Sequence, residues 1–173
     1  SWNGKEGEYF FTTKDNEGKS VDIHKHASKK KVLNDCEDSL RRLNTDYIDL
    51  FQIHWPDATT PVSETMEALE QLIGEGKIRA GGVCNYPVDL LREAEKTLTL
   101  ASNQVPYSMV RRDIENDLVP YCTGKNTGIL AYSPMQRGLL TGRIRPGHKF
   151  NEGDSRPDTP WFKEPNMSNI IPV

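Results

Sequence analysis

Residues Tyr47–Pro56, with the sequence YIDLFQIHWP, are the most informative stretch of the chain. Apolar residues follow one another closely here, which is typical of a strand covered on both faces in a parallel sheet. A histidine, a tryptophan and a proline come directly afterwards, and proline cannot continue a central strand. The sequence therefore places an imidazole at the point where a buried strand ends.

Strand and helix signals alternate on both sides of this stretch. We predict strands at residues 8–14, 47–54, 80–85, 103–108 and 128–133, and helices at 28–43, 63–75, 87–94 and 114–122. Ser28 and Ser63 are the expected N-caps of the first two helices. Residues 15–26 read as a polar loop. Such alternation predicts parallel strands joined by right-handed crossovers.

Two architectures of this kind are a doubly wound sheet and a (β/α)8 TIM barrel. A nucleotide-binding doubly wound sheet carries a glycine fingerprint after its first strand, whereas Gly74-Glu75-Gly76 lacks the third glycine and ends a helix. We therefore predict an α/β barrel of which about five strand-helix units are present, since whole barrels need ~250 residues. Residues 1–143 would contain these units, and residues 144–173 would form a long loop or irregular C-terminal segment.

The predicted strands end in polar side chains that can act together. These side chains are Lys14, His54, Asn85, Gln104 and the pair Tyr132-Ser133. Each alone has an ordinary structural explanation, such as a solvated edge or a turn. In a parallel barrel, however, the carboxyl ends of all strands open onto one rim, where active sites lie. The grouping predicts a functional site at that rim.

Composition excludes several other classes of function. A net charge of −3 argues against general nucleic-acid binding. No stretch approaches the ~20 apolar residues of a membrane span. The three cysteines form no CxxC pair, so we predict neither a disulfide framework nor a zinc site, and a reducing cytoplasm is the expected location. We also predict no metal at His24 and His26, because an HxH pair in a polar loop is rarely a site.

Five motifs, in order, resemble the aldo-keto reductases. They are TTK, YIDLFQIHWPD, EGKIRAGGVCN, QVPYS and LAYSPMQRGLLTGR, and they run from about Tyr9 to Arg143. The resemblance implies a (β/α)8 barrel that binds NADP(H) in extended form and reduces a small aldehyde or ketone by hydride transfer. The family implies NADP rather than NAD; substrate identity and oligomeric state stay open.

The resemblance also implies roles for individual residues. Lys14 and His54 match the family's active-site lysine and histidine, and Trp55 would wall the substrate pocket. Asn85 and Gln104 match the pair that hydrogen-bonds the nicotinamide carboxamide. Cys84 stands where the family has serine, and a thiol is a weaker donor than a hydroxyl. The remaining cofactor-binding matches are Tyr132, on which the nicotinamide ring would stack, and the pyrophosphate loop residues Ser133, Pro134, Met135, Arg137, Gly138, Leu139 and Arg143.

These roles agree with the chemistry of the side chains. Amides can answer both the donor and the acceptor of a carboxamide, and Arg137 and Arg143 suit a diphosphate. A neutral imidazole at His54 can donate to a substrate carbonyl. Asp57 is expected to cap a turn after the proline.

The chain departs from the family in three respects that affect activity. None of its tyrosines stands in the motif of the family's proton donor, the donor's aspartate partner is also missing, and the grip on the 2′-phosphate is not found. We therefore expect either a part of a longer enzyme or a truncated product with impaired turnover. The alternative is a non-catalytic nicotinamide-binding regulatory barrel resembling potassium-channel β subunits, against which the presence of His54 argues.

Overall fold

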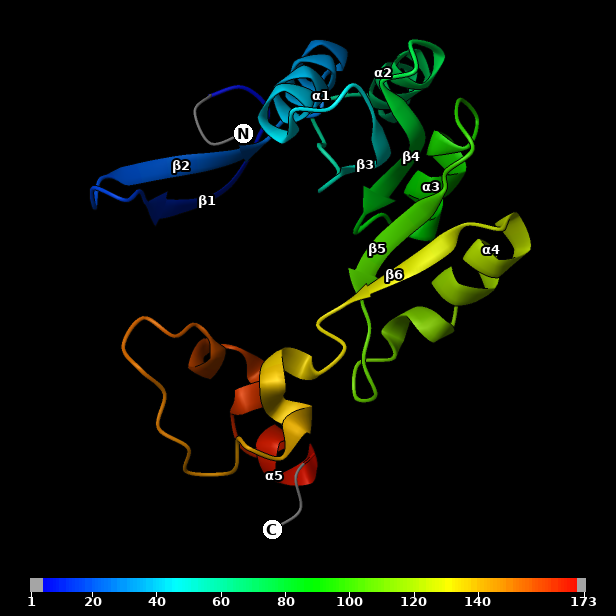
Figure 1. The fold of residues 1–173 in the computed structure, drawn as a ribbon. Coiled ribbons are helices and arrows are strands. Elements are labelled where there is room, and N and C mark those ends of the chain that lie inside the picture. The colour runs from blue at the N-terminus through cyan, green and yellow to red at the C-terminus, as the bar shows by residue number, and fades with distance from the viewer. Residues whose placement is uncertain (1–4, 171–173) are drawn as a thin grey trace. The chain divides into compact units, whose positions relative to one another are not determined.

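The computed structural model describes residues 5–170, which fold as two compact units (Figure 1). The first unit runs to Val105 and includes Asp117–Leu130. The second contains Pro106–Asn116 and the described residues from Ala131 onward.

A β-hairpin opens the first unit. Strands β1 (Glu8–Lys14) and β2 (Ser20–Lys25) pair antiparallel as a two-stranded sheet, with Lys14 opposite Ser20. The carboxylate of Asp15 closes the connecting turn by accepting hydrogen bonds from the backbone N–H groups of Glu17 and Lys19, both at 2.9 Å. The expectation of a polar loop over residues 15–26 is therefore wrong for β2.

The main sheet has four strands in the order β3-β4-β5-β6. These are β3 (Ile48–Ile53), β4 (Ile78–Cys84), β5 (Ser102–Pro106) and β6 (Gly128–Tyr132). Strand β4 pairs in parallel with both β3 and β5. Ile53 lies opposite Val83, and Cys84 lies opposite Gln104, so the carboxyl ends of these strands are level with one another. The predicted α/β fold of strand-helix units with parallel strands is confirmed for this sheet.

Within residues 5–170, one α-helix precedes the first strand of this sheet, and three more connect its successive strands. They are α1 (Lys29–Leu43), α2 (Val62–Gly74), α3 (Val88–Ala94) and α4 (Leu118–Lys125). Ser28 caps α1 as predicted, because its Oγ accepts a hydrogen bond from the Lys31 N–H at 3.4 Å. Ser63 is not a cap: α2 begins one residue earlier, at Val62, after Pro61. Proline suits a helix start because its φ is already helical.

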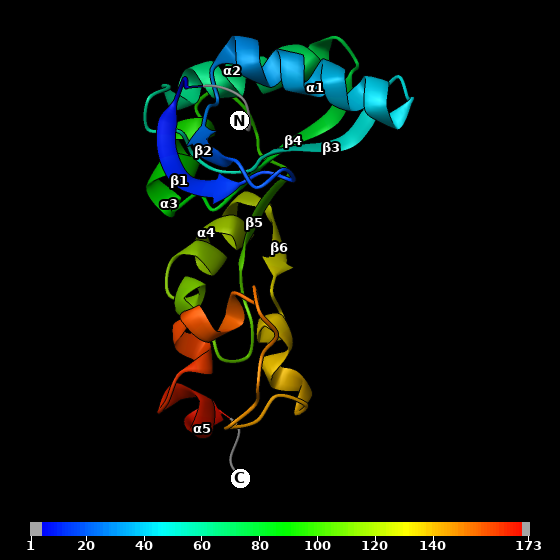
Figure 2. The ribbon, with the colours of Figure 1, turned by 90° about the vertical axis from the view of Figure 1, so that its left-hand side faces the viewer.

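The core of the first unit lies between α2 and the sheet. Helices α1 and α2 pack side by side, and α2 also packs on β4 and α3 (Figures 1 and 2). Met66, Ala68, Leu69 and Leu72 of α2 are fully buried there. Gly81 of β4 lets the helix approach closely, since a Cβ at this position would lie 3.2 Å from Leu69 Cδ1.

Three free thiols lie in this unit, on three different elements. Cys36 is in α1, Cys84 ends β4 and Cys122 is in α4, and all three are buried. Burial is the main cause that raises the pKa of each thiol above its ordinary value.

The second unit has a small apolar core of its own. Leu139, Ile144, Phe162 and Met167 form it, with Phe150, Trp161 and Ile170 packed around them. Its elements are short: 3₁₀ turns at Gln136–Thr141, Arg156–Asp158 and Pro160–Phe162, and the helix α5 (Asn166–Ile170). Residues 144–170 thus contain brief helical turns within a mostly irregular path. A boundary at residue 143 stays a prediction.

Candidate active site

Three of the predicted site residues meet at the carboxyl ends of β3, β4 and β5. His54 follows β3, Asn85 follows β4, and Gln104 lies in β5. The backbone N–H of Asn85 donates to the carbonyl of Gln104 at 2.9 Å, and its side-chain Nδ2 donates to the carbonyl of His54 at 3.2 Å. Asn85, which follows β4, is therefore hydrogen-bonded on both sides, to the end of β3 through His54 and to β5 through Gln104.

Asn85 holds a backbone conformation that few residues adopt readily. Its φ is +61°, in the left-handed region, where asparagine is better tolerated than most residues. The next residue, Tyr86, is fixed by Asn103, whose Nδ2 donates to the Tyr86 carbonyl at 2.8 Å and whose Oδ1 accepts from the Tyr86 N–H at 3.4 Å. Sequence reasoning missed Asn103. Its only signal in the sequence is a second amide residue, directly before Gln104 in β5.

Cys84 and Gln104 form a second contact between β4 and β5. The thiol of Cys84 donates to Gln104 Oε1 at 3.4 Å. A thiol is a weak donor, so this bond orients the glutamine amide less firmly than a serine hydroxyl would. With Oε1 facing Cys84, the amide nitrogen of Gln104 is the atom left to donate to a ligand.

His54 and Trp55 open onto a cavity of about 290 Å³ in the first unit. The hairpin forms its other wall, and the Phe10 ring lies 5.3 Å from the Trp55 ring, centroid to centroid. The lining residues from the hairpin and its exit include Phe10, Phe11, Ile23, His24, Lys25 and His26. His54 is exposed and Trp55 half-buried, so a small molecule in this cavity can reach both rings.

The structure does not bring Lys14 to this group. The sequence prediction placed Lys14 at the end of a strand in the parallel sheet, and that placement is wrong. Lys14 ends β1 of the antiparallel hairpin, where it is exposed beside the turn. The lysine that lines the cavity with His54 is Lys25, whose Nζ lies 2.9 Å from Glu8 Oε1.

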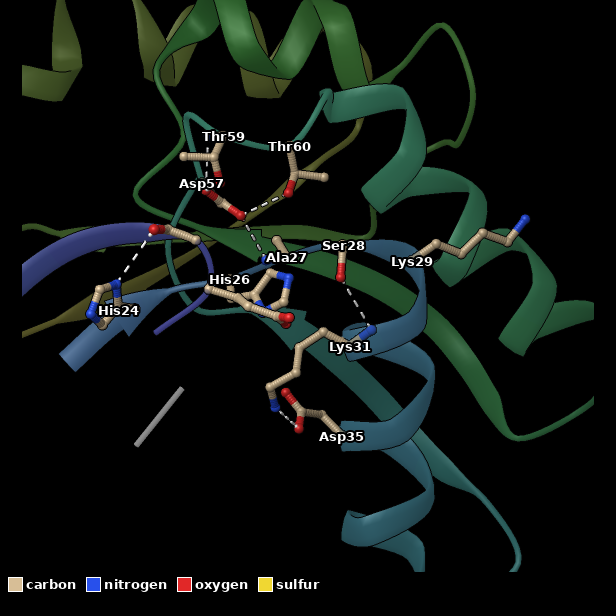
Figure 3. A network of polar contacts seen from close by, with 12 residues as sticks. His24, His26, Ala27, Ser28, Lys29, Lys31, Asp35, Asp57, Thr59 and Thr60 are labelled. Carbon is tan, nitrogen blue, oxygen red and sulfur yellow. Dashed lines mark hydrogen bonds and ion pairs between the residues drawn. The ribbon is translucent and has the colours of Figure 1, made fainter. Parts of the chain in front are cut away.

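Asp57, three residues after His54 in the chain, is buried, with 6% of its surface exposed (Figure 3). Its Oδ1 accepts from the N–H and the hydroxyl of Thr59, at 2.9 and 2.6 Å. Its Oδ2 accepts from the Thr60 hydroxyl at 2.8 Å and from the Ala27 N–H at 2.9 Å. The predicted turn cap is confirmed, and the carboxylate additionally reaches the start of α1. Burial alone would raise the pKa of Asp57, but these hydrogen bonds outweigh it and lower the pKa below its usual value.

Acid is expected to destabilise the first unit through this carboxylate. The pKa of Asp57 is lower in the folded chain than its unfolded value of ~3.9, so its stabilising contribution is complete above about pH 4 and is lost as pH falls toward the folded pKa. Urea midpoints measured between pH 7 and 3 should fall, and Asp57→Asn should flatten this dependence. Some slope should persist, because the pKa of Glu8 is also lowered. An unchanged slope in Asp57→Asn would contradict the assignment.

The predicted pyrophosphate loop lies in the second unit. Positive φ values occur at Ser133, Gln136, Arg137, Gly138 and Gly142, so this backbone turns tightly. The side chain of Arg137 donates to Ser155 Oγ at 2.8 Å. Arg143 and Met135 are exposed, whereas Leu139 is buried in the apolar core of this unit.

Tyr132 and Gln136 contact the loop that follows β5. The backbone N–H of Tyr107 donates to the Tyr132 carbonyl at 3.2 Å. Buried Gln136 accepts at Oε1 from the Ser108 hydroxyl at 2.8 Å. The cofactor roles of Tyr132 and of residues 133–143 stay predictions.

Residues 5–170 contain neither a metal-ligand cluster nor a helix that could cross a membrane. No three His, Cys, Asp or Glu side chains in this range gather as they would around a metal ion. None of the helices in this range combines the length and the apolar character that a membrane crossing requires.

Comparison with known proteins identifies the family. The Aldo/keto reductase family model matches residues 1–168. The chain belongs to the aldo/keto reductase family. It is 35% identical over 153 residues to the aldo-keto reductase YhdN of Bacillus subtilis, covering 88% of this chain and 46% of that protein. It is 37% identical over 152 residues to an NADH-specific methylglyoxal reductase of Escherichia coli, covering 86% of this chain and 46% of that one.

Solved structures of aldo/keto reductases show the same relationship. The glycerol dehydrogenase of Gluconobacter oxydans superposes with a TM-score of 0.85 at 35% identity, over 93% of this chain and 49% of that chain. The chain therefore spans about half the length of the relatives it matches. The predicted resemblance and the partial (β/α)8 architecture are confirmed.

Proposed function

We propose that this chain is part of a nicotinamide-dependent carbonyl reductase that acts on a small aldehyde or ketone by hydride transfer. The observation that carries the proposal is the group formed by His54, Asn85 and Gln104 at three adjacent strand ends, with His54 open to a cavity. Family membership supports it, because the relatives include a methylglyoxal reductase. The buried free thiols suit a reducing cytoplasm, which we propose as its location.

The residues present fit the nicotinamide end of a dinucleotide. A carboxamide needs both a donor and an acceptor, and the side-chain amides of Asn85 and Gln104 offer both within one hydrogen-bonded group. We assign the face of Tyr132 to the nicotinamide ring and residues 133–143 to the diphosphate. NADP(H) is the proposed cofactor, and it supplies the hydride when bound. A Klebsiella pneumoniae aldo/keto reductase was solved in complex with NADP, at 41% identity over 70% of this chain.

His54 acts on the substrate rather than on the cofactor in this proposal. Its imidazole can donate a hydrogen bond to the carbonyl oxygen, which polarises the C=O bond and favours attack on carbon. Trp55 and Phe10 shield the same cavity from water on one side. His54 should therefore affect reduction of the carbonyl rather than binding of the cofactor.

Nucleotide binding and carbonyl reduction test the proposal separately. NADPH and NADH are titrated into the full chain by calorimetry, and methylglyoxal reduction is followed by loss of NADPH absorbance. Gln104→Ala should weaken NADPH binding about tenfold, the effect of one or two lost hydrogen bonds. His54→Gln should leave NADPH binding unchanged and abolish any reduction.

The possible outcomes separate the candidate functions. A reductase is supported if Gln104→Ala weakens NADPH binding and if methylglyoxal reduction requires His54. Tight binding with no reduction favours the nicotinamide-binding regulatory barrel. Absence of nucleotide binding by the folded chain would reject both.

A further inference from the structure

The segment His54-Trp55-Pro56 is short and held at both ends. On one side, Ile53 pairs with Val83 in the parallel ladder of β3 and β4. On the other side, Asp57 is buried and fully hydrogen-bonded. Three residues thus span two fixed points, and the proline among them has a restricted φ. The direction of the His54 and Trp55 side chains therefore depends on where Asp57 is anchored.

Asp57 joins two parts of the first unit (Figure 3). Its bonds to Thr59 and Thr60 shape the turn that leads into α2. Its bond to Ala27 N fixes the chain between β2 and α1. Ala27 is itself buried, and its carbonyl accepts from the Thr65 hydroxyl of α2 at 2.8 Å. Moving Asp57 would therefore disturb the exit of the hairpin as well as the turn.

A second carboxylate fastens the hairpin to the same turn. Glu8 of β1 accepts from the Ala58 N–H at 3.1 Å through Oε2 and from Lys25 Nζ at 2.9 Å through Oε1. The hairpin thereby keeps Phe10 against Trp55. Both walls of the cavity are thus tied to residues 57 and 58, which follow His54 by three and four residues in the chain.

We propose that Asp57 is a positioning residue for His54 and Trp55: its carboxylate fixes the turn that aims both rings into the cavity. The inference rests on the proposed function, in which the orientation of His54 matters for polarising a carbonyl. If the Asp57 carboxylate served stability alone, removing it would lower thermal stability and leave the environment of His54 unchanged. That difference makes the proposal testable without turnover.

Proton NMR of the histidine rings provides the direct readout. The chain has four histidines, and the His54 C2–H resonance is assigned from its absence in His54→Gln. Spectra of the full chain at pH 7 are compared for the wild type, Asp57→Asn and Asp57→Ala. Thermal unfolding of each variant is recorded alongside.

Glu95→Gln is the matched control. The Glu95 carboxylate is also poorly exposed, at 12% of its side chain, and also accepts from side-chain hydroxyls, from Tyr121 at 2.7 Å and Thr127 at 3.5 Å. It lies at the end of α3 in the same unit. Its loss should lower thermal stability without changing the His54 resonance.

Asp57→Ala should shift and broaden the His54 resonance, because the turn then samples several conformations. Asp57→Asn should have an intermediate effect, since one amide oxygen keeps part of the acceptor set. If Asp57→Ala does not fold, Thr60→Val, which removes one bond only, should show a smaller shift in the same direction. A His54 resonance identical to wild type in folded Asp57→Asn and Thr60→Val would overturn the proposal. A resonance that shifts as expected, with reduction independent of His54, would reject the proposed function while leaving the positioning intact.

Discussion

Asn103→Ala is expected to lower the free energy of unfolding by about 3 kcal/mol, because it leaves the buried N–H and C=O of Tyr86 without partners. The Asn103 side chain is fully buried, so water cannot replace it at low cost. NADPH binding should weaken as well, because Tyr86 follows Asn85, whose left-handed backbone depends on its neighbours. Urea unfolding followed by circular dichroism and nucleotide calorimetry measure the two effects.

Two other variants serve as controls for Asn103→Ala. Asn34→Ala removes an exposed amide from α1 and should change stability by less than about 0.5 kcal/mol. Asn103→Asp keeps an acceptor for the Tyr86 N–H but removes the donor to its carbonyl and buries a charge, so it should also destabilise the chain. A stable Asn103→Ala protein with wild-type nucleotide affinity would show that the Tyr86 contacts matter little.

Leu69→Ala is expected to cost about 3 kcal/mol of folding free energy. The side chain is fully buried between α2 and β4, and removing its isobutyl group loses transfer free energy and leaves a cavity. The midpoint of urea unfolding should fall, with little change in slope.

Gly81→Ala provides a test specific to this packing. Alone, the added methyl would lie 3.1 Å from Leu98 Cδ2 and 3.2 Å from Leu69 Cδ1, so it should destabilise the protein slightly by crowding. In the double variant with Leu69→Ala the methyl enters the vacated space, and the combined loss should be smaller than the sum of the two single losses. Strict additivity would mean that Leu69 and Gly81 do not share this contact.

Local patterns predicted the parallel part of the fold because they report burial and chain direction. The apolar run before His54 became β3, and the alternation with helices became the parallel ladders of β3, β4 and β5. Ser28 caps α1 because a serine at a helix start needs no distant partner. The same reasoning places His54, Asn85 and Gln104 together, since adjacent parallel strands end at one edge.

Contacts between residues that lie far apart in the sequence could not be predicted from local patterns. The pattern of residues 8–14 correctly predicts a strand. No local signal shows, however, that this strand pairs antiparallel with β2 instead of joining the parallel sheet beside β3. The predicted role of Lys14 depended on that pairing. Leu43 fits the apolar stripe of α1 yet is 65% exposed, because the helix ends there. The reach of Asp57 to Ala27 joins residues thirty positions apart. Such contacts follow from tertiary packing, which no short motif encodes.

The three buried cysteine thiols can report which part of the first unit opens first. An alkylating reagent attacks the thiolate, which burial suppresses at Cys36, Cys84 and Cys122 as long as the surrounding layer stays closed. Each thiol lies in a different element, namely α1, β4 or α4. The order in which mass spectrometry detects their alkylation therefore shows which element becomes exposed to solvent first. We expect Cys84, at the end of the inner strand β4, to be labelled last.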